Sequence, residues 1–219
     1  MGDDRPILDA PGGPMACFFA APEGRPPAPG VVVVQEWWGL NGQIEGVARR
    51  LAGEGFAALA PDLYRGKQAD EPHEARKLSM QLDRGRALQD LRAAVGWLLE
   101  HGAGAVGAIG FCMGGSITFE LACIEERLGA AVPFYGLSDL RERTITCPVQ
   151  AHFGTADRFD PELLDDVAWR LGDLGNGSEL HRYEGAPHAF MNETRRSYRP
   201  QAAAVAWERA ISFLRANLS

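Results

Sequence analysis

One short stretch, residues 105–119, constrains the fold of this chain more than any other. An apolar run at 106–109 is typical of a buried strand, and apolar residues at helical spacing come shortly afterwards. Between them lies the pattern G-x-C-x-G, with Cys112 flanked at two positions on either side by Gly110 and Gly114. A strand that turns sharply into a helix needs very small neighbours at those positions. The pattern therefore predicts a nucleophile elbow with Cys112 at its apex.

A cysteine at this apex has a specific chemistry. The N-terminus of the following helix offers free N–H groups and a dipole, which favour a thiolate at Cys112. The alternative is a buried structural cysteine before a glycine-rich loop, because this glycine spacing also occurs by chance. An acid and a histidine at suitable places elsewhere in the chain decide between the two interpretations.

Length and charge limit the class of protein. With 219 residues, the chain is expected to form one domain over residues 1–219, with residues 1–13 as a loose N-terminal segment. The net charge of −7 argues against a nucleic-acid partner and an anionic membrane surface. No apolar run approaches the roughly 18 residues that span a bilayer. An acidic start unlike a secretory signal indicates reduced thiols and a cytoplasmic location.

Strands and helices alternate from residue 31 onward, which predicts an α/β fold with a mostly parallel central sheet and helices on both faces. The predicted strands are Met15–Ala20, Val31–Val34, Phe56–Ala60, Val106–Ile109, Ala130–Tyr135, Val149–Phe153 and Glu179–Tyr183. The predicted helices run from the cap Asn41 to Gly53, from Glu74 to Glu100 with Gly85 as a break point, from the elbow to Glu125, from Pro161 to Leu174 and from Arg195 to Leu218.

Candidate chemistry follows four of these strands. Glu36, Cys112, Asp157 and His188 each come after a different strand, and ligand sites in such sheets lie beyond the carboxyl ends of the strands. Taken alone, Asp157 would be a turn residue that caps the next helix, a role that Asp160 also fits, and His188 would be a surface histidine. The order nucleophile, acid, histidine favours a triad instead. In it, His188 moves the proton and Asp157 fixes the imidazole tautomer.

An oxyanion hole needs two backbone donors. We expect them to be the N–H of Met113, directly after the nucleophile, and the N–H of Trp37. Glu36 is unusual there, because a carboxylate opposes the negative charge that develops on the substrate. Either it is a solvated loop residue, or it pairs with the Cys112 thiol before substrate arrives and then accepts its proton.

Several motifs together resemble the dienelactone hydrolase family over about residues 15–215. They are Gln35-Glu36-x-x-Gly39-x-Asn41, Ala60-Pro61-Asp62-Leu63-Tyr64, Gly110-Phe111-Cys112-Met113-Gly114-Gly115, Gly154-x-x-Asp157 and His188-x-Phe190. The resemblance implies an α/β-hydrolase fold without a large cap domain, a Cys-His-Asp triad, and a Glu36 that activates the thiol when substrate displaces it. It implies no cofactor, and the four cysteines show no metal-ligand spacing. The family's named substrate, dienelactone, is a small enol lactone with a carboxylate.

The chain departs from the family where that carboxylate would bind. Asn192 stands where the family has an arginine four residues after the histidine, and Arg76, or Arg195 with Arg196, are candidates to replace it. The residues that we expect to contact substrate are Trp38, Arg76, Phe190 and Asn192.

The chemistry of sulfur narrows the reaction. A thiolate leaves a tetrahedral intermediate more easily than an alkoxide does, so turnover is favoured when the substrate carries a stabilised leaving group. We therefore expect a small activated ester or lactone as substrate, and a monomer or small homo-oligomer. Two alternatives are a non-catalytic hydrolase-like binding protein and a thiol redox protein that uses Cys112. The second lacks a nearby resolving cysteine, because Cys123 lies about three helical turns along.

Overall fold

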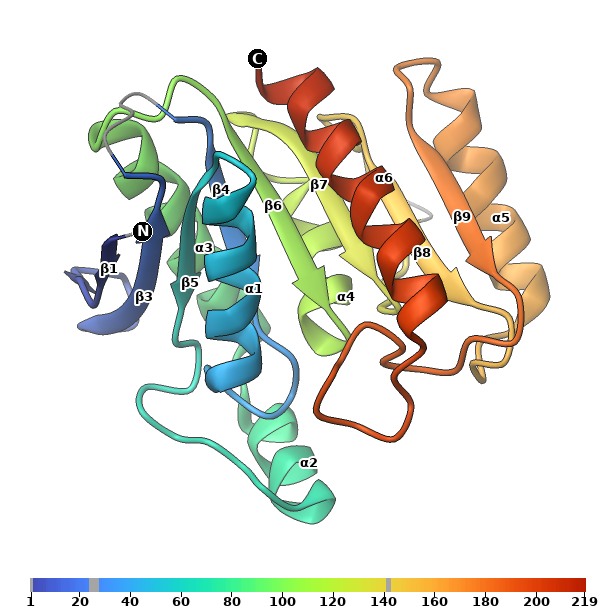
Figure 1. Ribbon diagram of the computed structural model, residues 1–219, viewed down its shortest axis with the longest axis horizontal. Helices are drawn as coiled ribbons and strands as arrows, with labels where there is room; N and C mark the ends of the chain where they lie inside the picture. Colours follow the sequence, from blue (N-terminus) through green and yellow to red (C-terminus); the bar gives the residue numbers. More distant parts are fainter. Residues whose placement is uncertain (1, 24–27, 141–142) are drawn as a thin grey trace.

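The computed structural model describes residues 2–23, 28–140 and 143–219, and these build one central sheet between two layers of helices (Figure 1). The strands are β1 (Gly2–Asp4), β2 (Ile7–Leu8), β3 (Met15–Ala21), β4 (Gly30–Val34), β5 (Ala57–Pro61), β6 (Val106–Phe111), β7 (Leu128–Phe134), β8 (Gln150–Gly154) and β9 (Glu179–Tyr183). Their order is β1-β3-β5-β4-β6-β7-β8-β9, with β2 beside β3. The pairings from β5 to β9 are parallel and those of β3 are antiparallel, so the predicted mostly parallel sheet is confirmed.

Helices cover both faces of the sheet, also as predicted. They are α1 (Gly42–Gly53), α2 (Pro72–Gln81), α3 (Arg84–Glu100), α4 (Met113–Leu121), α5 (Pro161–Asp173) and α6 (Pro200–Leu218). The helices α1 and α6 pack on one face, and α3, α4 and α5 on the other (Figure 1). The β4 strand shows why both layers are needed. Val31 and Val33 belong to the first core cluster and Val32 and Val34 to the second, and all four are fully buried.

The N-terminal segment corrects one prediction. Residues 1–13 were expected to be loose, but β1 and β2 both pair with β3. Ion pairs tie this segment to α1, since Asp3 lies 2.9 Å from Arg49, and Arg5 lies 2.6 Å from Glu45. Pairing with β3 satisfies the backbone hydrogen-bonding groups of this segment. The proline and glycine content of the segment does not reveal that pairing.

Two helix boundaries also differ from the prediction. The break between α2 and α3 falls at Leu82 and Asp83, where the Asp83 carboxylate accepts the N–H of Arg86 at 3.0 Å, and Gly85 lies inside α3. The last helix begins at Pro200, five residues after the predicted start at Arg195. The preceding residues, 189–199, form a loop instead, and this loop reaches the functional site.

The carboxyl ends of the parallel strands all point toward the end of the molecule where α2 lies (Figure 1). The described part of the connection from β7 to β8 contains no helix, consistent with the predicted absence of a large cap domain. Of the described helices, none combines the length and apolar character needed to span a bilayer.

Candidate active site

The turn between β6 and α4 has the strained geometry of a nucleophile elbow. Cys112 has φ 56° and ψ −118°, a left-handed conformation that a residue with a side chain adopts rarely. Its main-chain N–H donates to the carbonyl of Phe134 at 3.0 Å, which fixes the turn against β7. A Cβ at Gly110 would collide with Thr118 Oγ1 and the carbonyl of Gly114, so only glycine fits beneath the turn.

Three side chains from separate loops meet at this turn. The Cys112 Sγ lies 3.2 Å from His188 Nε2, and His188 Nδ1 lies 2.8 Å from Asp157 Oδ2. The other Asp157 oxygen accepts the N–H of Arg158 at 2.7 Å. The side chain of His188 is 41 % exposed, whereas that of Asp157 is only 7 % exposed. Solvent therefore reaches the imidazole, while the carboxylate bonded to it is shielded.

The charges and hydrogen bonds in the series Cys112, His188 and Asp157 favour a protonated imidazole on His188. Burial opposes the charge on His188, but the hydrogen bonds to Asp157 and Cys112 outweigh it and raise the pKa of the imidazole to about 10. The Asp157 carboxylate accepts a hydrogen bond from Nδ1–H, so Nε2 is the nitrogen that faces the Cys112 sulfur. A positively charged imidazole beside the sulfur is a common environment of reactive cysteines.

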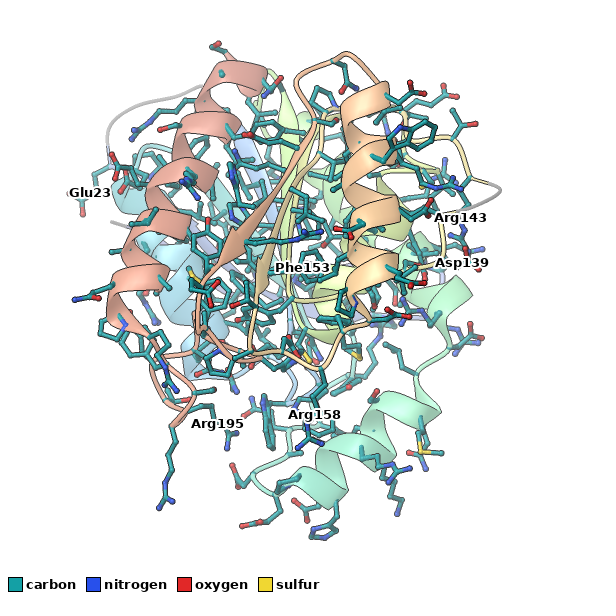
Figure 2. The ribbon with its side chains drawn as sticks, turned by 90° about the vertical axis from the view of Figure 1, so that its right-hand side faces the viewer. Glu23, Asp139, Arg143, Phe153, Arg158 and Arg195 are labelled. Atoms are coloured by element: carbon teal, nitrogen blue, oxygen red, sulfur yellow. The ribbon has the colours of Figure 1, made fainter. Side chains whose placement is uncertain are left out.

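A cavity of about 350 Å³ opens over the thiol. Its lining residues are Glu36, Trp37, Trp38, Cys112, His188, Ala189, Arg195 and Ser197. The guanidinium of Arg195 stacks on the Trp38 ring at 3.6 Å from the ring centroid. Figure 2 shows Arg158 and Arg195 at the same end of the molecule as α2. The cavity is small and largely apolar, with one arginine among its lining residues.

The two backbone donors predicted for the oxyanion hole follow Cys112 and Glu36 directly in the chain. Met113 is the first residue of α4, so helix geometry leaves its N–H without an intrahelical acceptor. Trp37 lies in the turn after β4, where Gly39 N–H donates to the Glu36 carbonyl at 3.3 Å. Neither the Met113 nor the Trp37 N–H has an acceptor within the part of the chain that the structure describes. An oxyanion hole requires two such unpaired donors, so the prediction for Met113 and Trp37 stands as a prediction.

Three of the residues predicted to contact substrate lie outside the cavity lining. Phe190 is fully buried among Phe134, Tyr135 and Tyr183, because the loop turns its ring into the core. Arg76 is exposed on α2 and does not line the cavity. Asn192 is 1 % exposed, and its amide contacts Glu36 instead of the cavity. Trp38 does line the cavity.

Glu36 is buried, with only 2 % of its surface exposed, so it is not a solvated loop residue. One carboxyl oxygen accepts from Asn192 Nδ2 at 2.6 Å and the other from the Tyr135 hydroxyl at 3.3 Å. Burial raises the pKa of Glu36, opposed by the Asn192 hydrogen bond and the charge on His188. The hydrogen bond of the Cys112 sulfur runs to His188, and not to Glu36 as the sequence had suggested.

Sequence reasoning missed two residues near the thiol. Tyr135 was treated as the end of a strand, but its hydroxyl meets Glu36 and its ring packs edge-on against His188 with centroids 5.2 Å apart. Ala189 lines the cavity with φ 59°, and its sequence context gives no sign of this conformation. The described residues contain no cluster of His, Cys, Asp and Glu placed to hold a metal ion.

The fold and site together define an α/β-hydrolase with a cysteine at the nucleophile elbow. The sequence profile of the dienelactone hydrolase family matches residues 15–218. The chain therefore belongs to the dienelactone hydrolase family, and it is an enzyme of the ester and lactone hydrolase class.

Relatives cover nearly the whole chain. It is 34% identical to a putative carboxymethylenebutenolidase of Aquifex aeolicus, over 92% of this chain and 93% of that protein. It is 33% identical to a probable 2-oxo-3-(5-oxofuran-2-ylidene)propanoate lactonase of a Bradyrhizobium species, over 92% of this chain and 89% of that protein. Among solved structures, a dienelactone hydrolase-like promiscuous phosphotriesterase from metagenomic libraries superposes with a TM-score of 0.88, at 28% identity and full coverage of both chains.

Proposed function

We propose that this enzyme hydrolyses small activated esters and lactones through an acyl intermediate on Cys112. The observation that carries the proposal is the continuous series from the sulfur through His188 to Asp157, with distances of 3.2 and 2.8 Å, beneath a cavity of about 350 Å³. The cytoplasmic location is part of the proposal, because a thiol nucleophile stays reduced there.

The proposed steps use the contacts of Cys112 and His188. The Cys112 thiolate attacks the carbonyl carbon, and the developing oxyanion takes hydrogen bonds from the N–H groups of Met113 and Trp37. The carbon–oxygen bond to the leaving group breaks, and the proton on His188 Nε2 goes to that oxygen. His188 then takes a proton from water, whose oxygen attacks the thioester. The acid is released, and the sulfur leaves as the thiolate beside the imidazolium.

The thiol restricts the substrate. If the leaving oxygen is a poorer leaving group than sulfur, the intermediate expels Cys112 and reverts to substrate. Enol lactones and aryl esters avoid this because their oxyanions are stabilised. We therefore expect turnover of an enol lactone and of para-nitrophenyl acetate, and little turnover of ethyl acetate. The hydrolysis of each is measured under equal conditions and compared with its alkaline hydrolysis rate.

Mass spectrometry of the protein after brief reaction with para-nitrophenyl acetate identifies the intermediate. One acetyl group on the peptide that contains Cys112 is expected. A disulfide or sulfenate on Cys112 without an acetyl group would favour the thiol redox protein, and binding without adduct or turnover would favour the non-catalytic binding protein. Broad activity on alkyl esters with none on enol lactones would contradict the proposed substrate class.

Arg195 is placed to select substrates with a carboxylate. It lines the cavity, and the Bradyrhizobium relative is named for a lactone that carries a propanoate group. Arg195→Gln is expected to raise KM for a carboxylate-bearing lactone by about tenfold, because a charge-assisted hydrogen bond is lost. The KM for neutral para-nitrophenyl acetate should stay unchanged. Arg196→Gln is the matched control, since Arg196 is exposed and outside the cavity lining. Equal KM changes for both substrates would refute this role.

A further inference from the structure

The hydrogen bonds around Glu36 fix the direction of the Asn192 amide. Asn192 Oδ1 accepts from the main-chain N–H of Thr194 at 3.0 Å and from its hydroxyl at 2.7 Å. A backbone N–H can only donate, so the oxygen of the amide must face Thr194. The Nδ2 group therefore faces Glu36, and the 2.6 Å contact between them is a donation from amide to carboxyl.

Tyr135 holds the second carboxyl oxygen from a rigid position. It is fully buried, has a strained φ of 35°, and its N–H donates to the carbonyl of His152 at 2.8 Å. The next residue, Gly136, lies so close to the elbow that a Cβ there would collide with the carbonyl of Cys112. The Tyr135 hydroxyl therefore has little freedom to leave Glu36.

Both oxygens of Glu36 thus have neutral donors, while the Cys112 sulfur lies at 3.2 Å from His188. We propose that Asn192 and Tyr135 are positioning residues that keep the Glu36 carboxyl off the thiol, so that the Cys112–His188 pair already exists in the resting enzyme. This inference rests on the proposed function, because it concerns the same nucleophile. It differs from the sequence expectation, in which substrate had to displace Glu36 from the thiol.

The charges that face Glu36 fit this arrangement. His188 and Arg195 both act on the carboxyl and favour its ionised form, whereas burial is the largest effect and raises its pKa. Burial and the charges of Glu36 and Cys112 raise the pKa of Tyr135 well above its ordinary value, so its hydroxyl stays a neutral donor. A carboxyl that loses the 2.6 Å hydrogen bond to Asn192 keeps only the longer one, 3.3 Å, to Tyr135, so its other oxygen can turn toward Cys112 and accept a hydrogen bond from the thiol.

Alkylation by iodoacetamide tests the inference without any ester. The Cys112 sulfur displaces iodide and forms a carbon–sulfur bond. Because Cys17, Cys123 and Cys147 are also free thiols, the rate is followed by mass spectrometry on the peptide that contains Cys112. The wild-type enzyme is expected to react rapidly at pH 7. Asn192→Ala should react about tenfold more slowly, as expected for one hydrogen bond lost from a buried group, with its pH profile shifted upward. Tyr135→Phe should shift the rate in the same direction, and it keeps the ring that packs on His188.

Removing the carboxyl separates positioning from a general structural role. The double variant Asn192→Ala with Glu36→Ala should recover the wild-type alkylation rate, because no carboxyl remains to capture the proton. Tyr183→Phe is the matched control: it also removes a buried hydroxyl, but one bonded to His152 at 2.8 Å, and its rate should equal that of wild type.

Two results would overturn the inference: an unchanged rate and pH profile in both Asn192→Ala and Tyr135→Phe, or no recovery in the double variant. If Asn192→Ala does not fold, as judged by circular dichroism, the comparison of Tyr135→Phe with Tyr183→Phe decides. Failure of the proposed function is seen separately, as rapid alkylation of Cys112 with no acetyl adduct from para-nitrophenyl acetate.

Discussion

Replacing Cys112 by alanine is expected to lower kcat/KM for para-nitrophenyl acetate by at least about 10⁴-fold, because loss of a nucleophile removes the covalent route altogether. The remaining rate would come from the oxyanion donors and the apolar cavity, which still bind and polarise the ester. The measurement is steady-state hydrolysis of the purified variant, with background hydrolysis subtracted.

The fold of the variant should not change, because the strain of the elbow lies in the backbone and alanine at Cys112 removes only sulfur. Circular dichroism and denaturant unfolding check this point. The control is Cys123→Ala. Cys123 follows α4, is partly buried, and donates its S–H to the Phe119 carbonyl at 3.3 Å, away from the cavity. Its removal should leave kcat/KM at the wild-type value. A Cys112→Ala enzyme with more than a tenth of wild-type activity would place the chemistry elsewhere.

The parts of this site that could be predicted from the sequence are those tied to strand ends. In a parallel sheet, each strand ends at the same edge, so Cys112, Asp157 and His188 could be placed together once the strands were assigned. The glycine spacing around Cys112 predicted the sharp turn between strand and helix. These are local signals, and they depend on residues within a few positions of each nucleophile or acid.

The direction in which a loop side chain points could not be predicted in the same way. Phe190 and Asn192 follow His188 closely, and both were predicted to contact substrate. The loop instead turns Phe190 into the core and Asn192 under the carboxyl of Glu36. The predicted helix from Arg195 included the end of this loop, because the prediction extended the apolar spacing of α6 back to Arg195. The helix begins instead at Pro200, a residue suited to the first position of a helix.

Tyr135 was missed because its role depends on two partners remote in sequence. Its hydroxyl meets Glu36, 99 positions away, and its ring meets His188. No pattern around Tyr135 indicates such contacts, which arise only when β4, β7 and the loop after β9 are brought together. The same holds for Arg195, whose contact with Trp38 joins two loops.

We expect the elbow glycines to matter as much for folding as we propose that Cys112 does for catalysis. Gly110→Ala is expected to destabilise the protein by about 3 kcal/mol or more, because its Cβ would collide with the backbone of Gly114, which cannot move without displacing α4 from β6. Urea unfolding followed by circular dichroism measures the free energy of unfolding. The matched control is Gly46→Ala in α1, where a Cβ meets no atom within 4 Å.

That control should instead stabilise the protein by roughly 0.5–1 kcal/mol, because alanine loses less backbone entropy than glycine when a helix forms. The opposite signs of two identical substitutions make the test specific to the packing beneath Cys112. A Gly110→Ala protein that unfolds at the wild-type urea concentration would mean that the strand and helix can separate at the turn without cost. In that case the loops, and not the elbow, would set the position of the Cys112 sulfur relative to His188. The Gly110→Ala variant would then lose little of its ester hydrolysis.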